Sequence, residues 1–308
     1  MMVVCLHVLG EDFVVNDYLV FLRMPIFLFV SGVFAARAMS LPLRDFLIGK
    51  SLHLVWLYVV WSVIHFFGIY VLLRFVDGRP LNIAEFTDIY HDPLPTLWFL
   101  YALAINYTLL RVVRPFPPAA IVTILFLAYA VSTYVAPLTH ASFFHKTVRL
   151  MPFFAIAVYF GKTIIDITIA HARFWWVASL AYVLLSYLLL NIVGAHYAPL
   201  NFIVSALGIF SVIGFSQTVD RTLVGRGLAF IGGLSIYVFV LHRIFYEYIK
   251  RIMYKFDIPV EPETGFVLLP IIIAMCVLAG HFILRPRFDF VEKAPWLLKR
   301  PGSRTLEG

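Results

Sequence analysis

Three ionisable side chains lie in stretches of sequence that are otherwise apolar enough for a membrane: His7, Arg23 and His242. A charged group at membrane depth costs several kcal/mol, so such a group usually faces a partner or a water-filled cavity. Histidine is suited to proton transfer near neutral pH, and a guanidinium group can stabilise a developing oxyanion. The three residues are therefore candidates for acid–base chemistry inside a membrane protein.

Arg23 stands in a run, Leu22 to Phe34, that also carries Pro25 and the pair Ser31-Gly32. Membrane helices tolerate such helix breakers where neighbouring groups satisfy the freed backbone, which favours a packed bundle around a pocket. The alternative is that Arg23 reaches a lipid headgroup from a helix end, since Asp17 lies only a few residues earlier.

The two histidines also have structural alternatives. His7 and His242 can each be interface residues that only form a hydrogen bond to a neighbouring helix. Ser235 and His242 share one helical face, which predicts a polar stripe toward the bundle interior. Gly232-Gly233 favours the other interpretation, in which close helix packing explains the whole run.

The composition indicates a polytopic membrane protein. Of the 308 residues, 62% are hydrophobic and only 13% are charged. The net charge of +7 comes from basic residues between apolar runs, which is typical of loops that set topology, so we expect no nucleic-acid partner. Metal-binding and nucleotide-binding motifs are absent from the sequence, so we expect no metal centre and no permanently bound cofactor.

The apolar runs predict an all-α transmembrane bundle of about ten helices in a single domain, 1–308. At 1.5 Å per residue the first run covers only about half of a hydrocarbon core, so we expect a truncated first helix and a native start upstream of Met1. The expected segments are 1–10, 18–38, 52–74, 95–111, 118–137, 148–166, 174–194, 199–215, 227–247 and 264–284.

Loop charges predict the orientation. One set of alternate loops, together with the tail from Arg285, carries about twice as many Lys and Arg residues as the other set. We therefore expect a protein of the cytoplasmic membrane whose C-terminus is cytoplasmic. The acidic loop at 75–94 then lies outside, where it can meet a hydrophilic substrate. In this topology His7, Arg23 and His242 share the outer half of the bundle, because His242 stands about 22 Å along an outward-running helix.

Two further groups are candidates for binding. Trp98 opens the segment at 95–111, where it is either part of the aromatic belt or a pocket residue. Arg44, Lys50 and His53 lie at the cytoplasmic entrance of the segment at 52–74. Basic groups there can hold the phosphates of an anionic donor, or they can only fix topology and contact membrane lipid headgroups.

With these residues in view, the sequence resembles the integral-membrane acyltransferase 3 family, particularly its polysaccharide and nodulation-factor sugar O-acetyltransferase branch. His7 matches the family's first-helix histidine, and Arg23-Met24-Pro25 through Ser31-Gly32 resembles its M-P-x-F-F-F-x-S-G segment. Leu97-Trp98-Phe99-Leu100 resembles its L-W-F-L segment, and the run from Gly233 to His242 resembles its late histidine segment. The pieces occur in order along the whole chain.

The sequence departs from the family pattern at two points. The family usually has an arginine about three turns before the first-helix histidine, and this chain begins too late to contain it. The paired arginines at the family's third-helix entrance are represented here by Lys50 and His53.

The resemblance implies transfer of an acyl group, most often acetyl, from cytoplasmic acyl-CoA to a hydroxyl of an extracytoplasmic glycan or lipid-linked sugar. It implies that His7 is the base and Arg23 the oxyanion partner, although an acyl-histidine intermediate is the alternative. By the same resemblance, His242, Ser31 and Trp98 bind the acceptor. Arg44, Lys50 and His53 bind the donor.

Two other functions fit the same intramembrane charges. A glycolipid or polysaccharide transporter, or a flippase, would use them as a pathway, although the sequence shows no inverted repeat of the kind common in transporters. An inactive scaffold in an export complex is the third interpretation.

Overall fold

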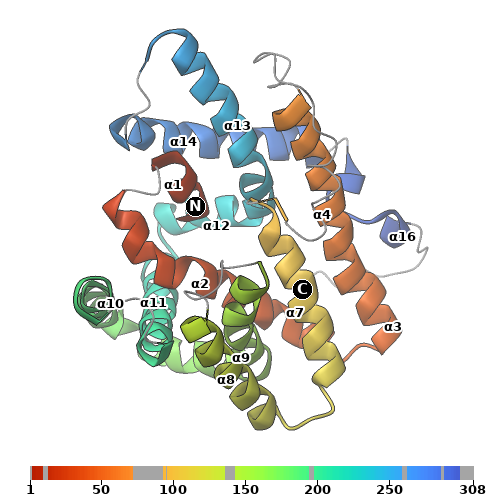
Figure 1. The fold of residues 1–308 in the computed structure, drawn as a ribbon, viewed down its shortest axis with the longest axis vertical. Coiled ribbons are helices and arrows are strands. Elements are labelled where there is room, and N and C mark those ends of the chain that lie inside the picture. Colours follow the sequence, from red (N-terminus) through yellow and green to blue (C-terminus); the bar gives the residue numbers. More distant parts are fainter. Residues whose placement is uncertain are drawn as a thin grey trace.

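The computed structural model describes residues 2–9, 13–71, 93–94, 96–135, 143–193, 198–258, 262–285 and 288–298 (Figure 1). Within these ranges the regular elements are helices, and no strand occurs. The expected acidic loop at 75–94 lies almost entirely outside the described residues, as do all residues beyond Leu298.

Several of the helices are extended by π-helical turns. Two π-helical turns extend α4: Leu47–Ser51 joins it to α3, and Phe66–Val71 continues it. Similar turns, Leu189–Val193 and Ala279–Leu284, continue α10 and α14. The α-helices are α1 (Met2–Leu9), α2 (Val14–Ala38), α3 (Leu43–Phe46), α4 (Leu52–His65), α7 (Trp98–Val113), α8 (Pro118–Val135), α9 (Phe143–Ala170), α10 (Trp175–Leu188), α11 (Ala198–Val219), α12 (Leu223–Gly233), α13 (Ser235–Lys255), α14 (Pro262–Leu278) and α16 (Pro295–Leu298).

The expected all-α polytopic bundle is confirmed. Among the described residues, seven helical units are long and apolar enough to cross a membrane, and the bent pair α12 and α13, if it is one span, makes an eighth. The apolar helix α7 is shorter, and α1 has only 8 residues. Together these units correspond in order to the segments that hydropathy predicts.

The expected span at 227–247 is not continuous. Helices α12 and α13 meet at Leu234 with a bend of 74°. Glycine disfavours the helix interior, and Gly232 and Gly233 stand directly before the break. A Cβ atom on either glycine would have nothing within 4 Å, so close helix packing does not explain this pair. Ser235 is exposed, so it does not share the buried face of His242.

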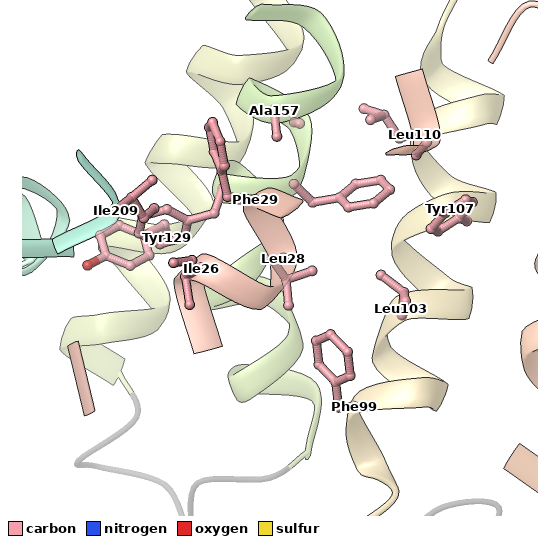
Figure 2. Close-up of a cluster of buried hydrophobic side chains, with 14 of the residues drawn as sticks. Ile26, Leu28, Phe29, Phe99, Leu103, Tyr107, Leu110, Tyr129, Ala157 and Ile209 are labelled. Atoms are coloured by element: carbon pink, nitrogen blue, oxygen red, sulfur yellow. The ribbon is translucent and has the colours of Figure 1, made fainter. Parts of the chain in front are cut away.

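Helix α2 lies at the centre of the larger hydrophobic core. It approaches α9 so closely that a Cβ atom on Gly32 would stand 2.5 Å from the carbonyl oxygen of Phe154. Figure 2 shows Leu28 on the side of α2 toward α7, and Phe29 beside Ala157 of α9. This packing on both sides holds the helix that carries Arg23.

A second hydrophobic core joins α1, α4, α13 and α14. Trp61 and Tyr237 are its largest fully buried side chains. The end of α1 is held against α14, since a Cβ atom on Gly265 would stand 2.9 Å from the carbonyl oxygen of Val8. The short first helix, which carries His7, is thereby fixed between α13 and α14 (Figure 1).

Candidate active site

His7 of α1 and His242 of α13 stack on each other. Their ring centroids are 5.3 Å apart and the rings are inclined by 26°. His242 is completely buried, whereas His7 is half-buried. The structure therefore brings together two residues from opposite ends of the chain that the sequence predicts to share one layer.

His242 presents a free nitrogen in this pair. Its Nδ1 atom lies 2.9 Å from the carbonyl oxygen of Val238. A carbonyl oxygen only accepts hydrogen bonds, so in the neutral ring Nδ1 carries the proton and Nε2 keeps a lone pair. Nε2 is buried and forms no hydrogen bond within the part of the chain that the structure describes. The site therefore contains, beside His7, a buried acceptor that no group of the described residues uses.

Two guanidinium groups act on His7. Arg23 is buried in α2, and Arg243 follows His242 in α13. Both lie close enough to His7 to interact with it electrostatically. Nη1 of Arg243 also donates a hydrogen bond to Oγ1 of Thr96, at 3.4 Å. His7 thus stands in a positively charged environment.

His65 of α4 completes the cluster. Its Nε2 atom lies 2.6 Å from the carbonyl oxygen of Val240, so in the neutral ring it donates a hydrogen bond across to α13. The side chain is almost fully buried and lies within electrostatic range of both Arg243 and His242. Because its ring nitrogen is engaged by the backbone, His65 positions α13 relative to α4.

Sequence reasoning missed Arg243, His65 and Thr96. Arg243 lies inside the expected span at 227–247, so the cost of an intramembrane charge, which singled out Arg23, applies to it equally. His65 lies inside the expected span at 52–74 and carried the same signal. Thr96 had no such signal, because threonine is common near helix starts and its contact with Arg243 is not visible in the sequence.

Ser31 and Trp98, the other expected acceptor-binding residues, do not join the histidine pair. Ser31 lies about 12 Å along α2 from Arg23, and its carbonyl oxygen accepts a hydrogen bond from Oη of Tyr107 at 3.4 Å. Trp98 packs edge-on against Phe143, with ring centroids 6.3 Å apart.

The expected donor-binding residues lie on α3, on the π-helical turn and on α4. Arg44 and Lys50 are exposed, and His53 is half-buried. Nδ1 of His53 accepts a hydrogen bond from the backbone N–H of Ala294, at 3.4 Å. Lys50 and Lys293 both act electrostatically on His53. Arg44 is not among the charged groups that act on His53, whereas Lys293, which the sequence did not single out, acts on it together with Lys50.

The fold is that of a multi-pass helical membrane protein, and its candidate site contains a stacked histidine pair with two arginines in electrostatic range of His7. The family model of the acyltransferase domain, acyltransferase 3, matches residues 1–285. The chain therefore belongs to the acyltransferase 3 family and is a membrane acyltransferase by family. Searches of curated proteins and of solved structures found no match.

Proposed function

We propose that the protein transfers an acyl group, most often acetyl, from cytoplasmic acyl-CoA to a hydroxyl of an extracytoplasmic glycan or lipid-linked sugar. The observation that carries this proposal is the stack of His7 on His242, with Arg23 and Arg243 both in electrostatic range of His7. All four residues lie within the range matched by the acyltransferase family.

In the proposed reaction His7 is the general base. It takes the proton of the acceptor hydroxyl as the hydroxyl oxygen attacks the thioester carbonyl. The tetrahedral intermediate then collapses, the carbon–sulfur bond breaks, and the coenzyme A thiolate takes the proton back from the imidazolium of His7. The products are the acyl ester and free coenzyme A, and His7 returns to its neutral form.

The neighbouring residues stabilise the intermediate and bind the acceptor. Arg23 and Arg243 stabilise the oxyanion of the intermediate, an interaction that is strong where water is excluded. The lone pair on Nε2 of His242 accepts a hydrogen bond from the acceptor, whose hydroxyl groups supply the donor that this buried atom lacks in the described residues.

The proposal places the protein in the cytoplasmic membrane with its C-terminus in the cytoplasm. The loop charges support this orientation, and so does a contact between two segments that both belong to the predicted cytoplasmic side. Nε1 of Trp296, near the end of the chain, donates a hydrogen bond to the carbonyl oxygen of Ile48 at 3.1 Å. A fusion of a periplasmic reporter at Gly308 should be inactive, and reporter activity there would overturn the orientation.

Membranes incubated with isotopically labelled acetyl-CoA test the function. We expect label in the glycan fraction of membranes that contain the wild-type protein, and none when His7 is replaced by Ala at equal protein abundance. Movement of glycan without label would identify a transporter. If the glycan is neither labelled nor moved, the protein is an inactive scaffold.

A further inference from the structure

The residues after the family match form an ordered segment against the bundle. This C-terminal segment, residues 288–298, contains a 3₁₀ turn at Asp289–Val291 and the short helix α16. Val291 and Ala294 are buried. The segment is therefore packed as part of the protein, although it lies outside the range of the acyltransferase family model.

Tryptophan side chains hold this segment along α4. Nε1 of Trp56 donates to the carbonyl oxygen of Phe290 at 2.9 Å, and Nε1 of Trp61 donates to that of Val291 at 3.2 Å. Non-helical backbone against a membrane helix needs partners for its carbonyl groups, and the indole N–H groups supply them. Farther along, Trp296 donates to Ile48, so the segment is held at both ends.

A side-chain contact ties the same segment to α13. Oη of Tyr237 donates a hydrogen bond to Oε1 of Glu292. Burial raises the pKa of Glu292 above its ordinary value, and the neighbouring Lys293 acts in the opposite direction. The contacts with α4 and with α13 together fix the position of residues 292–294.

That position brings Lys293 to the expected donor-binding residues. The backbone N–H of Ala294 donates a hydrogen bond to Nδ1 of His53. Lys293 acts electrostatically on His53 from the C-terminal segment, and Lys50 does so from the π-helical turn that precedes α4. Both lysine side chains are exposed. Two ammonium groups from distant parts of the chain therefore flank one half-buried imidazole.

The distance along α4 suits a phosphate site for a thioester donor. His53 and His65 belong to the same helix and are separated by about 18 Å along its axis. His65 borders the histidine pair, where the thioester must react. In coenzyme A the pantetheine arm separates the sulfur from the phosphates, so the phosphates must bind well away from the reacting carbonyl.

Resting on the proposed function, we propose that the C-terminal segment completes the donor site, with Lys293, Lys50 and His53 together binding the phosphates of acyl-CoA. Ammonium groups pair well with phosphate oxygens. A lipid headgroup offers the same phosphate chemistry, so the experiment must distinguish the two sources.

The test compares two donors that carry the same acetyl thioester, acetyl-CoA with phosphates and acetyl-pantetheine without them. For Lys293→Gln we expect KM for acetyl-CoA to rise roughly threefold to tenfold, as for loss of one charge-assisted phosphate contact, while kcat changes by less than about twofold. KM for acetyl-pantetheine should not change. Lys50→Gln should show the same pattern.

Two further variants control for charge and position. Lys162→Gln removes an exposed lysine of α9 and should leave both KM values unchanged. Trp296→Phe keeps every charge but removes the N–H that anchors the segment, so it should raise KM for acetyl-CoA alone. An unchanged KM for acetyl-CoA in Lys293→Gln would overturn the proposal, and so would an equal rise with both donors.

Lipid and direct-binding measurements settle the source of the phosphate. If the effect of Lys293→Gln on KM disappears in vesicles of neutral lipid, the lysines bind headgroups and the proposal is wrong. Binding of coenzyme A to the purified full chain, measured without turnover, should weaken in Lys293→Gln by the same factor. This readout separates failure of the donor site from failure of the proposed function, because it does not require an acceptor.

Discussion

His7 stacks on His242 at a centroid distance of 5.3 Å, while Nδ1 of His242 is engaged by its own helix at the carbonyl of Val238. The backbone of α13 thus holds the ring of His242 in place, and the ring of His7 packs against it. The half-buried position of His7 leaves it the more accessible of the two. This asymmetry supports our proposal that His7 transfers the proton and that His242 orients the acceptor, and the following variants test each role.

Replacement of His7 by Ala or Gln should abolish acyl transfer. Loss of a general base reduces turnover by roughly two to four orders of magnitude. The measurement is transfer per folded molecule in membranes with saturating acetyl-CoA, with membrane abundance near that of wild type. Retention by His7→Ala of more than about a tenth of wild-type transfer would mean that His7 is not the base.

Two replacements of His242 distinguish the roles of its two ring nitrogen atoms. Asn keeps a donor near Nδ1 but offers nothing at Nε2, whereas Gln places an amide oxygen near the position of Nε2. We expect His242→Asn to raise KM for the acceptor roughly tenfold or more, and His242→Gln to recover part of the loss. KM for acetyl-CoA should stay constant in both. Equal kinetics of the two variants would show that His242 only packs against His7.

Arg243 should contribute to turnover, since it lies near His7 and is held by Thr96. Removal of one oxyanion-stabilising donor costs roughly 10²- to 10³-fold in kcat. We expect Arg243→Gln to lose about that much, and Arg243→Lys, which keeps the charge but not the planar fork, to lose less. Initial rates with both substrates saturating provide the comparison. A change confined to KM for acetyl-CoA would instead place Arg243 in donor binding.

The contact of α2 with α9 should be sensitive to a single methyl group. In Gly32→Ala the new Cβ atom would stand 2.5 Å from the carbonyl oxygen of Phe154 and 2.7 Å from Cβ of Ala157, so the helices must separate. Such overpacking typically costs about 1–3 kcal/mol. Thermal unfolding in detergent should show a lower midpoint for this variant.

Gly227→Ala is the matched control for that measurement. A Cβ atom on Gly227 has nothing within 4 Å, and alanine is the better helix former, so the midpoint should stay constant or rise. A wild-type midpoint for Gly32→Ala would mean that the contact between α2 and α9 is looser than these distances indicate.

Hydropathy by itself determined the all-α bundle and the order of its apolar segments, because the cost of leaving backbone or charge in lipid depends only on local composition. The same cost marked His7, Arg23 and His242 as unusual. The cost of an intramembrane charge applied to Arg243 as well, but a single sequence does not show which of these charged residues lie close to one another in the fold.

Only the tertiary structure decided which of these groups meet. The stack of His7 on His242 depends on α1 packing against α13 and α14, and the hydrogen bond from Arg243 to Thr96 depends on how α13 lies beside the start of α7. Lys293 illustrates the same limit. In the sequence it is one basic residue of a tail, and it reaches His53 because indole groups of α4 hold the backbone of the C-terminal segment. Contacts between distant segments arise from packing of whole helices, which local pattern does not encode.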